Sequence, residues 1–306
     1  MTFSIVAFDP IKKEWGVATQ SKFLAVGAVV PWAQANIGAV ATQSYANTSF
    51  GPRGLALMAS GLSAAETLDR LLMNDEGREQ RQVGVIDRSG SAATFTGRKC
   101  MEWAGGVIGR GYAAQGNILV SEATVIAIAT GFEKANGELA DRLVAALAAG
   151  QKAGGDRRGQ QAAAVLVVRE QGGYAGFNDR YIDLRVDDDR QPIERLAEIL
   201  QLHHLYFGKP AESELIPMDR SAIRELQRIA KASKQYAGPL SGEYDDVTRS
   251  AVEALISTEN LEDRWPLGQA KIDPVSFRFL RKLYPPKKKV KRKPVKRSAK
   301  PKNKTK

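Results

Sequence analysis

The chain has 306 residues, of which 43% are hydrophobic and 26% charged, a balance typical of a globular protein with room for two domains. The net charge is +11, but residues 287–306 alone carry twelve Lys or Arg and no acid. Residues 1–286 therefore sum to −1 (11 − 12), which excludes a strongly basic folded part. A single cysteine, Cys100, excludes an internal disulfide, and the adjacent His203 and His204 make a poor zinc site. Neither a signal peptide nor an apolar run of about 18 residues is found. These features predict a cytoplasmic protein that uses no membrane span, metal ion or cofactor.

The chain begins with a predicted buried strand at 2–8, in which Phe3, Ile5 and Ala7 alternate with the other positions. Farther on, Ser63 and Glu66 form a capping box, which marks the start of a helix. Further strands are predicted at 15–20, 25–32, 37–43, 81–87, 91–96, 161–168 and 180–186, a glycine-rich segment at 105–116, and helices near 121–133, 138–149 and 192–207.

Blocks of strands followed by pairs of helices indicate an α+β arrangement rather than alternating βα units. Two antiparallel sheets with helices packed outside each would bury every apolar face, with the first strand central in its sheet. A second unit of three short helices is expected after residue 218, followed by a tail too rich in Lys, Arg and Pro to fold. The predicted divisions are a first domain at 1–208, a linker at 209–218, a small helical domain at 219–285 and a disordered tail at 286–306.

Thr2 is the first candidate for chemistry, because a buried strand at the start of the chain places the chain's own amine in the interior or in a cleft. The first domain up to about residue 189 contains no histidine and one cysteine, so a hydroxyl nucleophile there would need a base other than imidazole. An α-amine has a pKa of about 7.7–8.0 and activates an N-terminal threonine in known enzymes. Ser4 lies on the same face of the strand and would support Thr2. The alternative is an ordinary first strand, in which both are ordinary strand hydroxyls.

Other candidates each have a simpler structural explanation. Ser21 and Lys22 could form a nucleophile and lysine base, or lie solvated at a strand end. Thr42 and Gln43 could orient an amide, or belong to a hydrogen-bonded turn. Asn117 could present donors to a substrate oxygen, or begin a helix.

The turn 154–159 is harder to explain as scaffold alone. It holds Asp156 and two guanidiniums, Arg157 and Arg158, between glycines, and such a group suits capture of a carboxylate or phosphate. A surface turn with locally paired charges is the alternative. Cys100 and both histidines are expected to be dispensable for any activity.

Several sequence blocks resemble the bacterial family catalogued as domain of unknown function 1028. They are TFSIVAFD (2–9), GVATQSKF (16–23), VGAVVPWA (26–33), GAVATQ (38–43), RQVGVID (81–87), QGN (115–117), AGGDRRG (153–159) and LRVDD (184–188). The resemblance implies the N-terminal-nucleophile (Ntn) hydrolase fold, a four-layer αββα sandwich. The segment 219–284, with LSGEYDDVTR and ENLEDRW, resembles a small helical domain called peptidoglycan-binding-like.

By this resemblance, Thr2 would be nucleophile and base together once Met1 is removed, and the reaction would be hydrolysis of an amide bond in a small substrate. Donors near Gly116 and Asn117 would hold the oxyanion, and Arg157 would orient an acidic group of the substrate.

Two other functions stay open at this stage. The same sandwich could bind a small ligand without catalysis. Alternatively, residues 287–306 could tether the protein non-specifically to nucleic acid or another polyanion, although a solubilising tail without a partner explains the same charges. A homo-oligomer is compatible with each reading.

Overall fold

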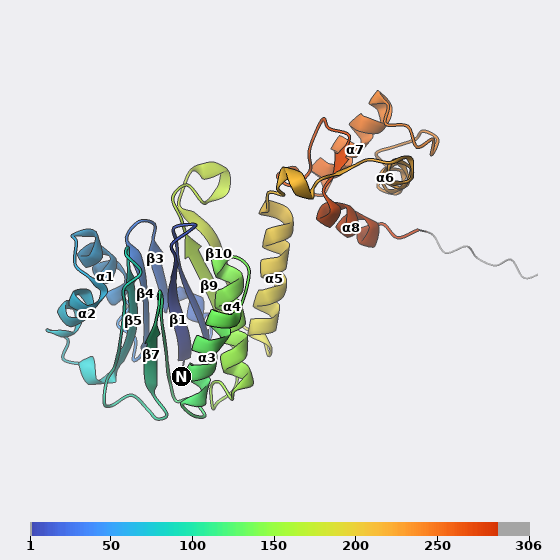
Figure 1. The fold of residues 1–306 in the computed structure, drawn as a ribbon. Helices are drawn as coiled ribbons and strands as arrows, with labels where there is room; N and C mark the ends of the chain where they lie inside the picture. Colours follow the sequence, from blue (N-terminus) through green and yellow to red (C-terminus); the bar gives the residue numbers. More distant parts are fainter. Residues whose placement is uncertain (1, 287–306) are drawn as a thin grey trace, which may run out of the picture. The chain divides into compact units, whose positions relative to one another are not determined.

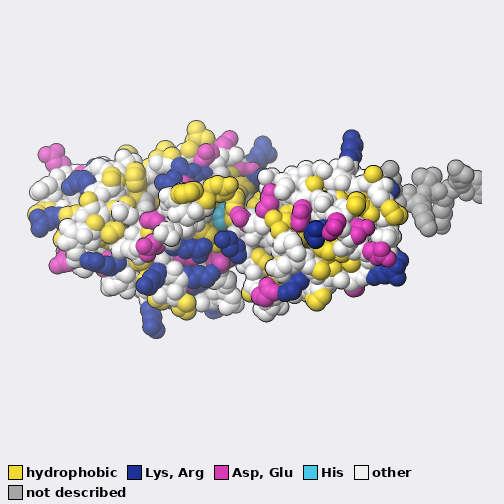
Figure 2. Space-filling view, turned by 90° about the horizontal axis from the view of Figure 1, so that it is seen from above, with side chains coloured by type: hydrophobic (Ala, Val, Ile, Leu, Met, Phe, Trp, Pro, Cys, Tyr) yellow, Lys and Arg dark blue, Asp and Glu magenta, His cyan; other side chains and the backbone are white. Residues whose placement is uncertain are grey.

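The computed structural model describes residues 2–286, drawn as a ribbon in Figure 1. The predictions of a disordered tail and of polyanion binding by residues 287–306 concern residues outside this range. The chain forms two compact units that divide between Leu202 and His203, inside helix α5 (Pro192–Phe207). No helix within 2–286 combines the length and apolar character needed to span a membrane. On the face shown in Figure 2, Lys and Arg are interspersed with Asp and Glu, which fits the near-neutral sum of this part of the chain.

The first unit contains two antiparallel sheets. The large sheet has the order β10-β9-β2-β1-β8-β7, so β1 is an interior strand, and the small sheet has the order β3-β4-β5-β6. The large sheet comprises β1 (Thr2–Asp9), β2 (Glu14–Ser21), β7 (Gly105–Gly109), β8 (Tyr112–Asn117), β9 (Ala162–Val168) and β10 (Arg180–Val186). The small sheet comprises β3 (Pro31–Gln34), β4 (Gly38–Ser44), β5 (Arg81–Asp87) and β6 (Ala92–Thr96).

Three apolar clusters hold these elements together. Phe3 and Ile5 pack with α3 (Ala123–Lys134), α4 (Leu139–Lys152) and the first part of α5 on one face of the large sheet. Val6 lies in the cluster between the two sheets. The far face of the small sheet packs against α1 (Phe50–Ala59) and α2 (Ala64–Leu72), on the opposite side from α3 and α4 in Figure 1. Because side chains alternate along a strand, β1 contributes to two clusters and is buried on both faces.

The capping box is confirmed, because the Ser63 and Glu66 side chains bond reciprocally at the start of α2. The strand predicted at 25–32 is wrong. Its first half is a 3₁₀ turn, η1 (Val26–Ala28), entered through Ala25 in the left-handed region (φ 52°), and β3 begins only at Pro31. Gly27 lies so close to the large sheet that a Cβ would stand 2.6 Å from Ala164 Cβ. Tertiary packing therefore overrides the apolar strand-like pattern here.

Helix α1 was not predicted because its sequence contains Gly51, Pro52 and Gly54, which disfavour helices. The structure explains both glycines. A Cβ on Gly51 would lie 2.2 Å from the Trp32 ring, and one on Gly54 would lie 3.1 Å from Val40. The helix is held by its close approach to the small sheet and not by its intrinsic propensity.

The second unit, taken by itself, has its own apolar core around Leu226, Leu255 and Leu280. Its helices are α6 (Arg220–Ala232), α7 (Asp246–Thr258) and α8 (Pro274–Leu283), each begun by an aspartate whose side chain accepts a backbone N–H: Asp219, Asp245 and Asp273. Strand β11 (Ile216–Pro217) pairs with β12 (Lys271–Ile272), so part of the predicted linker belongs to this unit. The remaining 3₁₀ turns are η2 (Arg78–Gln80), η3 (Tyr174–Gly176) and η4 (Glu212–Glu214).

Candidate functional site

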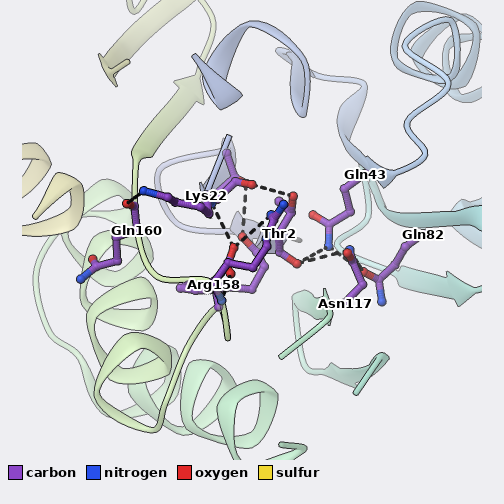
Figure 3. Close-up of polar contacts among 11 residues, drawn as sticks. Thr2, Lys22, Gln43, Gln82, Asn117, Arg158 and Gln160 are labelled. Carbon is purple, nitrogen blue, oxygen red and sulfur yellow. Dashed lines mark hydrogen bonds and ion pairs between the residues drawn. The ribbon is translucent and has the colours of Figure 1, made fainter. Parts of the chain in front are cut away.

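A group of buried carboxamide side chains lies between the two sheets, at the end where β1 begins (Figure 3). Gln82 of β5 bonds to two other side chains of the group. Its Oε1 accepts from Gln43 Nε2 and from Asn117 Nδ2, both at 2.8 Å. The Gln82 Nε2 group donates to the carbonyl of Gly116 at 2.7 Å and to Thr96 Oγ1 at 2.9 Å. These neutral bonds fasten β4, β5 and β8 to one another at this position.

Ser4 extends the same network deeper between the sheets. Its hydroxyl donates to Gln43 Oε1 at 2.7 Å and accepts from Gln115 Nε2 at 2.7 Å. The hydroxyl has a single hydrogen, so its donor capacity is used in this bond. Ser4 therefore supports the network and does not face a substrate.

Thr2 lies at the outer end of this network, on the same strand face as Ser4. Its carbonyl oxygen accepts from Gln43 Nε2 at 3.3 Å and from Asn117 Nδ2 at 3.4 Å, so amides from two different strands hold its backbone. Its hydroxyl donates to Ser21 Oγ at 3.1 Å across the β1–β2 pairing. The side chain is thereby oriented on β1 by its neighbours.

A cavity of about 390 Å³ opens beside Thr2. Volumes of this order suit small molecules. Its wall combines hydroxyl and amide groups, two arginines and an apolar side; the lining residues are Thr2, Ser21, Phe23, Val26, Val29, Val30, Gln43, Ser44, Tyr45, Ala46, Arg81 and Arg158. None of these described lining residues is a His, Cys, Asp or Glu.

The turn 154–159 places its two arginines differently. Asp156 is buried and accepts the backbone N–H groups of Lys22 (2.9 Å) and Arg158 (2.8 Å), which ties the turn to the end of β2. Arg158 lines the cavity, and its guanidinium lies 3.4 Å from Asp156. Arg157 is exposed and donates to the carbonyl of Glu102. The arginine at the cavity is therefore Arg158, where the sequence had favoured Arg157.

One residue of the cavity wall has a strained backbone, and two further strained residues adjoin buried or lining positions in the sequence. Ser44, a lining residue, has φ 70°, and Ile118, directly after Asn117, has φ 51°. Ala25 at the entry to η1 is also left-handed. Non-glycine residues adopt this region at a cost of about 1–3 kcal/mol each and do so most often at functional sites. The strain is consistent with a binding site in this region.

The other arginine of the wall, Arg81, is paired with Asp75 through two bonds, at 2.7 and 3.1 Å. The hydrogen bond from Arg81 lowers the pKa of Asp75, and the same bond raises the pKa of Arg81. This pair is therefore ionised throughout the ordinary pH range. Arg81 also donates to the carbonyl of Tyr45, so it fixes the loop after β4.

The predicted site residues divide into two groups. Thr2, Gln43 and Ser21 meet at the cavity, whereas Ser4, Thr42 and Asn117 are buried behind its wall. Thr42 donates to the carbonyl of Asn47, which is the turn role given above as its alternative.

Lys22 contributes its backbone to Asp156, while its ammonium donates to the carbonyl of Gln160 at 3.3 Å, away from Thr2 (Figure 3). Asn117 ends β8 and stands well before α3, so its amide serves strand pairing and not a helix start. Gln82 and Gln115 were missed, and the signal that could have found them is a glutamine at an inward position of an otherwise apolar strand.

Within the described part of the chain, no group of three or more His, Cys, Asp or Glu side chains could hold a metal ion. The one cysteine, Cys100, is buried and donates to the carbonyl of Arg81, outside the cavity wall.

A family model described as "family of unknown function (DUF1028)" matches residues 2–196. The chain belongs to the DUF1028 family. The crystal structure of protein SPO2555 from Silicibacter pomeroyi, described as a DUF1028 protein, is similar, with a TM-score of 0.61 and 29% sequence identity over 66% of this chain and 89% of that chain. No curated protein matches.

The DUF1028 match lies within the first unit and contains every residue of the network and of the cavity wall. The second unit lies outside the match. The site is therefore a feature of the DUF1028 domain itself.

Proposed function

We propose that the DUF1028 domain is an N-terminal-nucleophile hydrolase with a four-layer αββα sandwich, and that it cleaves an amide bond of a small substrate with Thr2 as nucleophile. The order of packing supports the fold: helices α3 and α4, the large sheet, the small sheet, then α1 and α2. The interior position of β1 in the large sheet agrees with it.

The observation that carries the proposed chemistry is the position of Thr2. It is the first residue of β1, it borders a cavity of small-molecule size, and no imidazole, thiol or carboxylate stands among the described lining residues. A hydroxyl nucleophile there needs a base, and the α-amine of Thr2 supplies one once Met1 is removed. Its ordinary pKa of about 7.7–8.0 leaves a useful neutral fraction near neutral pH.

In the proposed reaction, Thr2 Oγ attacks the substrate carbonyl while the Thr2 amine takes the hydroxyl proton. The C–N bond then breaks, and the resulting ammonium returns a proton to the leaving amine. A water molecule next attacks the ester on Thr2, with the amine again as base, and releases the carboxylic acid. The acceptor oxygen of Ser21 orients Oγ, while Gln43 and Asn117 fix the Thr2 carbonyl and so act as positioning residues.

The proposal is tested with protein that carries its purification tag at the C-terminus, since an N-terminal tag would cover the amine. Intact mass and N-terminal sequencing establish whether Thr2 is the first residue. A β-lactone probe then acylates an activated threonine hydroxyl by ring opening, which peptide mass mapping locates. Turnover is measured as the free amine released from a panel of small amides that includes N-acyl amino acids with a free carboxylate.

Labelling at Thr2 and turnover are expected in the wild type, loss of both in Thr2→Ala, and partial retention in Thr2→Ser. The matched control is Thr19→Ala on the neighbouring strand: Thr19 is buried, donates to the carbonyl of Phe3 and lies outside the cavity wall. Cys100→Ala is a second control. Active protein that still bears Met1, or Thr2→Ala with undiminished turnover, refutes the mechanism.

For the second unit, we propose the small helical fold called peptidoglycan-binding-like. Its three helices around one apolar core support this likeness in fold. No ligand is assigned to it.

A further inference from the structure

The cavity beside Thr2 has an uneven distribution of charge. Its wall contains two arginines and, among the described lining residues, no acid. Arg81 donates two bonds to Asp75, and its side chain is 18% exposed. The Arg158 side chain is 45% exposed, so Arg158 is the cation that a ligand can reach more readily.

Arg158 is held at the cavity by its own backbone. The N–H of Arg158 donates to Asp156 Oδ1 at 2.8 Å, and the Asp156 side chain is fully buried. The Arg158 side chain, by contrast, is 45% exposed, and its guanidinium lies 3.4 Å from Asp156 Oδ2. The buried carboxylate thus holds the backbone of Arg158 in place, while the guanidinium is partly exposed at the cavity. A planar guanidinium suits an oxyanion, which it binds through paired N–H donors.

Another part of the wall is apolar. Val26, Val29 and Val30 line it, and Phe23 and Tyr45 stand at the cavity with 53% and 59% of their surface exposed. Exposed aromatic side chains beside a cavity can remove apolar surface from water by packing against an apolar group of a ligand, which stabilises the complex. The cavity therefore offers a cation and an apolar surface to the same small molecule.

We propose that the substrates of this site are amphiphilic anions: N-acyl amino acids, in which a carboxylate pairs with Arg158 and an apolar group packs against Phe23, Val29 and Tyr45. The proposal rests on the function proposed above, because the amide of such a molecule would present its carbonyl to Thr2. Arg158 is here the specificity-determining residue. Asp156 is a positioning residue, since it acts through the backbone and guanidinium of Arg158.

The test measures binding separately from turnover. Isothermal titration on the Thr2→Ala variant compares three ligands: N-acetyl-phenylalanine, its neutral carboxamide, and N-acetylglycine, which lacks the apolar group. N-acetyl-phenylalanine is expected to bind at least about tenfold more tightly than either of the others, tenfold being 1.4 kcal/mol. Phenyl phosphate shows whether the oxyanion must be a carboxylate; binding as tight as that of N-acetyl-phenylalanine would overturn the assignment to N-acyl amino acids.

Arg158→Gln should weaken N-acetyl-phenylalanine about tenfold and leave the neutral carboxamide unchanged, and Arg158→Lys should fall between. The matched control is Arg157→Gln, which removes the adjacent, exposed arginine that bonds to Glu102. Equal affinities for acid and carboxamide, or equal losses in the two glutamine variants, overturn the proposal. Since binding requires no nucleophile, Thr2→Ala with full turnover would refute only the mechanism, whereas lost anion selectivity would refute only this assignment.

Discussion

The buried amide network makes a sharp prediction about Gln82. In the variant Gln82→Leu, the side chain keeps a similar volume but loses its acceptor and donor groups. The Oε1 atom accepts from Gln43 and Asn117. In the leucine variant Asn117 Nδ2 keeps only the Thr2 carbonyl as an acceptor, so one of its two buried N–H groups loses its partner. Gln43 Nε2, by contrast, keeps the carbonyls of Thr2 and Gln115. A buried unsatisfied donor costs about 1–3 kcal/mol, which is the loss expected for this variant. That is a large share of the about 5–15 kcal/mol by which a typical protein is stable.

The matched control is Gln20→Leu, on β2 of the same sheet. Gln20 is also fully buried, but neither of its amide atoms has a hydrogen-bond partner among residues 2–286. Leucine at this position removes an unpaired amide and leaves no neighbouring group without a hydrogen-bond partner. The free energy of unfolding of Gln20→Leu should therefore equal or exceed that of the wild type. The same substitution should thus act in opposite directions at two buried positions.

The assay is urea denaturation followed by tryptophan fluorescence in a Trp265→Phe background. Trp265 is the one tryptophan after residue 202 in the sequence, so the remaining Trp15, Trp32 and Trp103 report on the first unit. A loss below about 1 kcal/mol in Gln82→Leu, or an equal loss in Gln20→Leu, would refute the reasoning that the network's bonds and not its volume stabilise the site.

Two further predictions concern other parts of the chain. Burial alone would raise the pKa of Asp273, but hydrogen bonds from Arg264 and Ser276 outweigh it and lower that pKa. The stabilisation is therefore present above the ordinary Asp pKa and lost as pH falls through the lowered value. In urea denaturation, the difference in free energy of unfolding between the wild type and Asp273→Asn should be largest above about pH 4. A difference that grows towards pH 3 would contradict this. Gly51→Ala should destabilise the first unit by about 1–3 kcal/mol, because the added methyl group would collide with the Trp32 ring. The expected sign is notable because alanine normally favours a helix over glycine. An unchanged or raised melting temperature would contradict this prediction.

Much of the fold was readable from the sequence where local pattern and tertiary environment agree. The alternation in β1 predicted a buried strand, and the structure places it inside the large sheet. The Ser63–Glu66 spacing marked the start of α2 because a capping box is a local device. Thr2, Ser21 and Gln43 were chosen as separate candidates, and the pairing of β1 with β2 and the facing of the two sheets bring them to one cavity.

Tertiary structure alone decided the rest. Helix α1 contains Gly51 and Gly54, and only the approach to Trp32 and Val40 makes these residues fit a helix. Gln82 acquires its importance from Gln43 and Asn117, which are distant in sequence, and no local pattern marks such partners. Arg157 and Arg158 are equivalent as neighbours in a glycine-flanked turn. The backbone bond to Asp156 directs Arg158 to the cavity, while the Glu102 carbonyl holds Arg157 elsewhere, because side-chain direction depends on contacts that the folded chain alone supplies.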